Sequence, residues 1–482
     1  MKKTTTKTNP ITETNPITKT RTKTKTSIGH HTFTISQRIL GEEMYSRGYV
    51  KSGRSSIRAF AADKLLQDFV NYMCKTNEIG IYIPIRGTGD WRPARKSFEK
   101  NGEVTIEHYG TWKIVYKSEN MKGLSWTLRY NTCSQDFNEY IVEAKINPKT
   151  FLGIQDYITA SDSRYLLEVE EKFNIEARKI SSILGDFSNY RPKRIDFCIN
   201  LDLKELGVPC TPEQMMYLIK KSDYSSNFKE LQYYDKKSHR YKAPDKNSHY
   251  LKSGSVNINC YYKHPQLMEQ FPDCPNIEDA QHIIRFEVQC KYAKTYIMHR
   301  SEQERMMKEK ESRSREYIDN KICVDSDNAI SAEKIIHRRF NDDPVKIIYR
   351  MLSDITAETI INKYFRQVIR MGDYYPLATA IKMVEEASLS PSTENLIVQT
   401  LESINRIGIA RTRALIQPQA MSSFYRTLGY LAKMGINPVT IPKSFKVKHI
   451  PNLLDAFNKL RDLGGVGGFL VGEGVTYEYL GE

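Results

Sequence analysis

The 482-residue sequence predicts an α+β fold, an antiparallel sheet with interposed helices followed by a helical C-terminal domain. Between about 78 and 146, short runs of β-branched and aromatic residues alternate with Gly, Asn and Ser turns, which is typical of antiparallel strands. From there to about 300, helical and strand-like stretches alternate. After 300 the pattern is charged and has helical spacing.

The first half of the chain divides into four parts. Residues 1–26 are a Thr/Lys-rich repeat with prolines and little to bury, so we expect a disordered tail. Residues 56–76 carry apolar side chains at helical spacing and predict an amphipathic helix. The β-rich stretch follows, with runs such as IGIYIPIRG and LSWTLRYN. A further helix is expected across about 159–183.

Three strands are expected next, in RPKRIDFCINLDL, VNINCYYK and QHIIRFEVQCK, with a helical stretch at 212–221 after the first of them. We therefore assign residues 27–300 to one α+β domain. Residues 301–330 are charged and predict a helical linker, and 331–482 predict a helical C-terminal domain that binds DNA. Its segment AMSSFYRTLGYLAKMG ends in glycine, a common helix stop, and fits a helix-turn-helix or simply a packed helix.

The charge of the chain indicates a polyanionic partner. The net charge is +15, of which the tail contributes +6 and the remaining residues +9, and nucleic acid is the leading candidate. The eight cysteines include no CxxC pair, which argues against a zinc ribbon. No apolar segment follows the first lysines and no long apolar run occurs, so we expect neither a signal peptide nor a membrane span. We therefore expect the protein to work in the cytoplasm of its host cell.

Two of the expected strands carry a carboxylate beside cations. By strand alternation Arg194 and Asp196 share one face of their strand, and Arg285, Glu287 and Lys291 share one face of theirs. A carboxylate is rarely buried without a partner, so a salt bridge such as Asp196 with Arg285 is one interpretation. The other is a site for Mg²⁺ or Mn²⁺, which prefer such hard oxygen ligands.

The stretch VNINCYYKHPQL places two tyrosines and a lysine at a strand end. Alternation puts Tyr261 and Lys263 on one face and Tyr262 on the other. Only about one free tyrosine in a thousand is ionised at pH 7, so attack on a phosphodiester needs help. Lys263 can favour the phenolate or hold a phosphate oxygen while a divalent cation polarises the phosphate. An ordinary strand end would have the same residue types.

Several of these stretches, in order, resemble the rolling-circle replication initiators of filamentous phages, the gene II/X replication proteins, and their relatives on plasmids and prophages. The matching stretches are HYGTWKIVY (108–116), VEAKINPKTFLG (142–153), RIDFCINLD (194–202), CYYKHPQL (260–267), IIRFEVQCK (283–291) and, more weakly, SSFYRTLGYLAKMGI (422–436). The ordered set is more specific than any single motif.

The resemblance implies that residues 27–300 are a nicking-joining endonuclease domain of the rolling-circle initiator type. Such a protein nicks one strand of supercoiled double-stranded origin DNA, stays attached to the 5′ phosphate through a tyrosine, and leaves a 3′ hydroxyl that primes the host polymerase. It later cuts the displaced single strand and rejoins it into a circle. The implied partners are origin DNA and the host replication helicase and polymerase, with no membrane.

The family's tyrosine-x-lysine-histidine motif matches Tyr261, Lys263 and His264, and the carry-over gives the nucleophile role to Tyr261 with Lys263 assisting. The neighbouring cations are assigned to phosphate and DNA binding, namely Arg194, Arg285, Lys291 and His264. Rejoining through a phosphotyrosine needs no ATP, which agrees with the absence of a P-loop motif.

By the same resemblance, Asp196 and Glu287 bind a catalytic Mg²⁺ or Mn²⁺, with Glu143 and His108 as further ligand candidates. The alternative for Glu143 is an exposed strand residue paired with Lys145, and for His108 a turn histidine. Many rolling-circle nucleases use a His-x-His pair as ligands. This sequence contains no His-x-His pair; His30 and His31 are adjacent and lie near the tail. Metal binding would therefore have to rely on carboxylates.

Two other functions compete with this hypothesis. A non-enzymatic DNA-binding initiator or copy-control protein would share the basic charge and the helical domain, and a conjugative relaxase would use similar chemistry at a transfer origin. The ordered motifs with Asp196, Tyr261 and Glu287 disfavour the first. The missing histidine pair disfavours the second.

Overall fold

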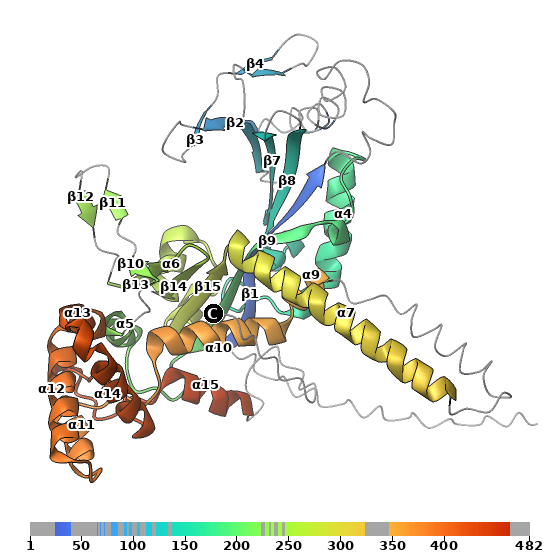
Figure 1. Ribbon diagram of the computed structural model, residues 1–482. Coiled ribbons are helices and arrows are strands. Elements are labelled where there is room, and N and C mark those ends of the chain that lie inside the picture. The colour runs from blue at the N-terminus through green and yellow to red at the C-terminus, as the bar shows by residue number, and fades with distance from the viewer. Residues whose placement is uncertain are drawn as a thin grey trace, which may run out of the picture.

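The computed structural model describes most of the chain (Figure 1). The described residues are 25–39, 65, 68, 72, 79–84, 91–93, 96–98, 104–106, 112–117, 122–133, 137–222, 227–230, 233–235, 240–242, 246–322 and 347–462. Nearly all of the predicted tail, most of the predicted helix 56–76, and His108 lie outside these residues. None of the helices within them is long and apolar enough to cross a bilayer.

The centre of the protein is an eleven-stranded sheet in the order β10-β13-β14-β15-β9-β1-β8-β7-β6-β2-β3. Neighbouring strands pair antiparallel throughout. The strands are β1 (Ser27–Ile39), β2 (Ile79–Pro84), β3 (Trp91–Pro93), β6 (Trp112–Lys117), β7 (Leu124–Cys133), β8 (Phe137–Ile146), β9 (Arg191–Asp202), β10 (Lys229–Glu230), β13 (Ser248–Lys252), β14 (Val256–Tyr262) and β15 (Ile283–Cys290). Two small pairs stand apart, β4 (Lys96–Phe98) with β5 (Val104–Ile106) and β11 (Tyr233–Asp235) with β12 (Arg240–Lys242).

Helices interrupt the strands and fill the C-terminal part, so the predicted α+β class is confirmed. They are α3 (Pro148–Leu152), α4 (Leu166–Ile180), α5 (Pro212–Lys221), α6 (Lys263–Gln270), α7 (Tyr292–Ile322), α9 (Ile347–Met351), α10 (Asp354–Ile369), α11 (Leu377–Glu385), α12 (Pro391–Ile407), α13 (Ile409–Leu415), α14 (Met421–Lys433) and α15 (Leu453–Asp462). The start of α5 is determined by residues next to each other in the sequence. Thr211 and Gln214 form a reciprocal capping box around Pro212 at the first turn.

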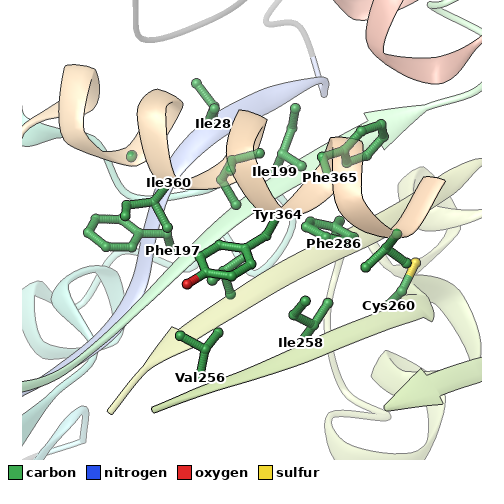
Figure 2. Packing of buried hydrophobic residues seen from close by; sticks show 14 of the residues in the cluster. Ile28, Phe197, Ile199, Val256, Ile258, Cys260, Phe286, Ile360, Tyr364 and Phe365 are labelled. Atoms are coloured by element: carbon green, nitrogen blue, oxygen red, sulfur yellow. The ribbon is translucent and has the colours of Figure 1, made fainter. Parts of the chain in front are cut away.

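One face of the sheet is apolar and covered by helices. α10 packs on β1, β9 and β15 and crosses them in Figure 1. Figure 2 shows Ile360, Tyr364 and Phe365 of α10 over side chains of the strands, among them Phe197 and Phe286. All of these are buried. Alternation then directs the intervening residues of the same strands to the opposite face.

The same buried cluster continues from the sheet into the C-terminal helices. Its members run from Ile28 on β1 to Phe457 on α15. α7 begins one residue after β15, and residues 301–322 of the predicted linker belong to it. The boundaries expected near 300 and 330 stay a prediction.

A second, smaller cluster covers the end of the opposite face. It joins Leu267 of α6 with Ile158, Ala280 and Ile283. Ile283 shares its face of β15 with Arg285 and Glu287, since the three alternate along one strand. This cluster therefore shields one end of the polar face from water.

Candidate active site

The strand register brings the predicted side chains onto one polar face. β15 lies between β9 and β14. Across β9, Arg285 pairs with Asn200 and Gln289 with Asp196. Across β14, Arg285 pairs with Tyr261. Directly paired residues of antiparallel strands project to the same side, so the polar faces expected for the individual strands form a single face of the sheet.

Tyr261 lies half-buried on this face, opposite Arg285. Burial raises the pKa of Tyr261 above its usual value, and Arg285 opposes that rise as a nearby charge and hydrogen-bond donor. The phenol is therefore neutral at pH 7 in the free protein. Tyr262 lies on the other face, where its hydroxyl donates to the Gln281 carbonyl at 2.9 Å.

Arg285 is 1% exposed and is held by neutral acceptors. Its Nε donates to Asn200 Oδ1 at 2.6 Å, and Nη2 donates to the Ile158 carbonyl at 3.3 Å. Its Nη1 lies 3.4 Å from Nδ1 of His31. The salt bridge with Asp196 is not formed, because the register places Asn200 rather than Asp196 opposite Arg285.

Asp196 is instead bound by the cation two residues before it. Arg194 donates from Nε to Oδ1 at 2.6 Å and from Nη2 to Oδ2 at 2.9 Å. Thr32 of β1 adds a hydroxyl bond to Oδ2 at 2.5 Å. Asp196 is 2% exposed, so this bidentate pair compensates a buried charge. Arg194 therefore lies at the predicted site, where its guanidinium binds Asp196 rather than standing free for a phosphate.

Glu287, also buried, accepts hydrogen bonds from amides. Gln289 Nε2 donates to its Oε1 at 2.7 Å and Asn259 Nδ2 at 3.4 Å. Burial raises the pKa of Glu287, and the negative charge of Asp196 raises it further. The two carboxylates that were predicted as metal ligands therefore lie close enough to repel each other.

The carboxylate pair offers hard oxygen atoms of the kind that Mg²⁺ and Mn²⁺ prefer, and both oxygens of Asp196 are at present bonded to Arg194. Mg²⁺ is commonly held by one or two carboxylates together with water and substrate phosphates. Within the described ranges, no three His, Cys, Asp or Glu residues gather closely enough to hold a metal by themselves. Asp196 and Glu287 could thus supply protein ligands only as part of a set that the DNA phosphate and water complete.

Lys263 begins α6 rather than ending the strand, because β14 stops at Tyr262. It is 3% exposed, and its Nζ lies 3.4 Å from Gln266 Oε1. Burial lowers the pKa of Lys263 well below its usual range, and the positive charge of Arg285 lowers it further. In the part of the chain that the structure describes, neither Lys263 nor Arg285 has a carboxylate at ion-pair distance.

Glu143 lies on the same sheet but away from the carboxylate pair. Ser36 of β1 faces Glu143, whereas Thr32 faces Asp196, and four residues of strand span about 13 Å. The Glu143 carboxylate is buried and binds Arg129 at 3.1 Å and Lys193. The alternative of an exposed residue paired with Lys145 was therefore wrong.

Two further predicted cations lie at the margin. The His264 ring stacks on Tyr262 at 6.1 Å between centroids, and its Nε2 lies 3.9 Å from Glu278 Oε2. Lys291 follows the end of β15 and donates from Nζ to the Ser253 carbonyl at 2.7 Å.

Sequence reasoning missed His31, which lies at the centre of the site. The β1–β9 register shifts between His30, which faces Phe197, and Thr32, which faces Asp196. His31 is the extra residue of this bulge, and its ring meets Arg285. Burial lowers the pKa of His31 well below its usual value, and Arg285 and Lys263 lower it further. Alternation cannot reveal a bulge, so no local signal marked this residue.

Comparisons with known protein families, with curated proteins and with solved structures find no match for this chain.

Proposed function

We propose that this protein initiates rolling-circle DNA replication by nicking and rejoining one DNA strand through a covalent tyrosine intermediate. The observation that carries the proposal is the pairing of Tyr261 with buried Arg285 on the polar face, with Arg285 close enough to Lys263 for its charge to lower the pKa of Lys263. A phenol opposite a buried cation that has no carboxylate at ion-pair distance among the described residues suits a reaction in which a phosphate enters. The resemblance of the ordered motifs supports the same reaction.

In this proposal Tyr261 Oη attacks the phosphorus of the scissile phosphodiester. A bond forms between Oη and phosphorus, and the bond from phosphorus to the 3′ oxygen breaks. The phenolic proton is lost, and the departing 3′ oxygen gains one to become a hydroxyl. The reverse attack by a 3′ hydroxyl on the phosphotyrosine restores the DNA strand and the phenol, so joining consumes no ATP.

Arg285 and Lys263 bind and orient the phosphate. Their charges compensate the phosphate oxygens in a poorly solvated site, where such interactions are stronger than in water. The arriving phosphate adds its negative charge to that of Glu287, which already acts on both cations. Asn200, through its bond to Arg285 Nε, fixes the position of the guanidinium.

Asp196 and Glu287 would hold Mg²⁺ or Mn²⁺ beside the phosphate. When bound, the cation polarises the scissile phosphate and favours the ionised form of Glu287. Gln289 and Asn259 orient the Glu287 carboxylate, while Thr32 and Arg194 orient that of Asp196.

A non-enzymatic DNA-binding initiator is the second candidate. The observation that favours it is the raised pKa of Tyr261, because burial disfavours the phenolate that attack requires. In that case the polar face would bind phosphates without cutting DNA.

The test compares wild type, Tyr261→Phe and Tyr262→Phe on supercoiled DNA of the source element with Mg²⁺. Tyr262 is a matched control, since it is the next residue and points to the opposite face. We expect open circles and protein-linked DNA with wild type and Tyr262→Phe, and neither with Tyr261→Phe. Normal nicking by Tyr261→Phe would make that residue structural. If no protein nicks a DNA that it binds specifically, the binding-only function is favoured.

A further inference from the structure

The first two turns of α7 expose a pair of tyrosines. Tyr292 and Tyr296 are each 55% exposed, and their ring centroids lie 6.2 Å apart with an interplanar angle of 35°. Residues four apart on a helix are neighbours, so the two rings form one aromatic surface. Large aromatic side chains left in water in this way are typical of binding surfaces.

The helix that carries this pair is fixed to the sheet. Thr295 is fully buried, and its Oγ1 donates to the Lys193 carbonyl of β9 at 3.0 Å. Met298, one turn further, is buried in the main core. These two residues face the protein, so Tyr292 and Tyr296 face outward from a rigid support.

Several cations lie near the start of the helix that carries the pair. Lys291 directly precedes Tyr292, and its pKa is lowered by partial burial and by the nearby charges of Lys252 and Arg194. Arg191 is exposed at the start of β9. Together with partial burial, its charge lowers the pKa of His299, which follows Tyr296 by three residues.

The aromatic pair begins two residues after β15, the strand that carries Arg285. Arg285 and Gln289 share one face of β15, and Lys291 connects the strand to α7. The six residue steps from Arg285 to Lys291 correspond to about 20 Å of extended chain. A DNA strand that leaves the candidate site in the direction of α7 would cover this distance in a few nucleotides.

We propose that Tyr292 and Tyr296 are a base-stacking platform for single-stranded DNA, with Lys291, Lys252 and Arg191 binding its phosphates. Only unpaired bases present free faces to a protein aromatic ring, whereas duplex bases are already stacked. The nearby cations favour a polyanion over an apolar protein surface, although Ile297 beside the tyrosines is also exposed. The choice of single-stranded DNA rests on the proposed function, in which one strand is displaced.

The test measures binding of a fluorescent oligo(dT) and of a duplex of equal length by the full chain, in EDTA so that nicking plays no part. The variants are Tyr292→Ala/Tyr296→Ala and the conservative Tyr292→Phe/Tyr296→Phe. The matched control is Tyr217→Ala, which removes an exposed tyrosine from α5. All three positions are exposed, so thermal unfolding should confirm that every variant folds.

We expect the alanine pair at 292 and 296 to weaken oligo(dT) binding at least tenfold, because stacking contributes roughly tenfold or more per base. The phenylalanine pair and the control should bind like wild type, and duplex binding should change little. An unchanged oligo(dT) affinity, or an equal loss for duplex and single strand, would overturn the platform. Nicking is scored separately, so a protein that fails to nick but shows this selective loss retains the platform while losing the proposed function.

Discussion

Tyr261 and Arg285 face each other across β14 and β15, and the guanidinium beside the phenol is buried among neutral acceptors. Burying a charge without an ion-pair partner is costly, and hydrogen bonds only partly offset the loss of water. The position of this charge beside a phenol is consistent with a site that an anion completes.

Arg285→Lys should destabilise the protein although it keeps the charge. A lysine is shorter and lacks the planar fork, so it cannot serve Asn200 and the Ile158 carbonyl together. Loss of one such buried partner costs roughly 1–3 kcal/mol of unfolding free energy. Urea unfolding measures the change. The control is Arg191→Lys on the same sheet, an exposed site that should shift the unfolding free energy by less than about 0.5 kcal/mol. Identical midpoints for both variants would mean that the guanidinium bonds contribute nothing.

Lys263→Met should stabilise the protein at neutral pH while abolishing nicking. The folded-state pKa of Lys263 is lowered, chiefly by burial, so the unfolded chain binds its proton more tightly. The resulting penalty is largest below the folded pKa and disappears as the pH rises towards about 10.4, the unfolded value.

The measurement is thermal unfolding of wild type and Lys263→Met between pH 7 and pH 10. The advantage of the variant should shrink as the pH rises, whereas the exposed Lys145→Met should show no such trend. A variant that is less stable than wild type at pH 7 would show that Lys263 is well compensated in the folded state.

Much of the fold followed from local patterns. The helix at 212–221 begins at a capping box, and its sequence bounds match α5 almost residue for residue. Strand alternation correctly placed Tyr261 and Tyr262 on opposite faces, because both lie in a regular strand along which burial alternates. Local chemistry determines such features, so one sequence is sufficient to predict them.

The side-chain partners within the candidate site could not be predicted from the sequence, because they depend on strand register and strand order. Nothing local indicates that β15 lies between β9 and β14, or that Asn200 rather than Asp196 faces Arg285. The bulge that turns His31 onto the polar face comes from a mismatch between two strands far apart in sequence. Each of these is a long-range relationship that periodicity does not encode.

Glu287→Gln and Glu143→Gln should have opposite effects on stability, although both remove one buried carboxylate charge. Burial and Asp196 raise the folded pKa of Glu287, so the folded protein binds this proton more tightly than the unfolded chain does. The contribution of Glu287 to stability therefore falls as the pH rises from the unfolded pKa, about 4.3, through the raised folded pKa. Above that window Glu287→Gln should be more stable than wild type.

Glu143→Gln should instead unfold more easily than wild type, because it leaves Arg129 and Lys193 without their counter-charge.

Added Mg²⁺ should also distinguish the roles of Glu287 and Glu143. If Asp196 and Glu287 hold the cation, millimolar Mg²⁺ should raise the melting temperature of wild type and of Glu143→Gln, because a ligand that binds only the folded state stabilises it. Glu287→Gln should lose this response together with nicking. The idea fails if the Glu287→Gln melting temperature rises with Mg²⁺ as much as that of wild type, since the cation would then bind elsewhere. Equal loss of the response in both variants would instead place Glu143 among the ligands, despite its distance from Asp196.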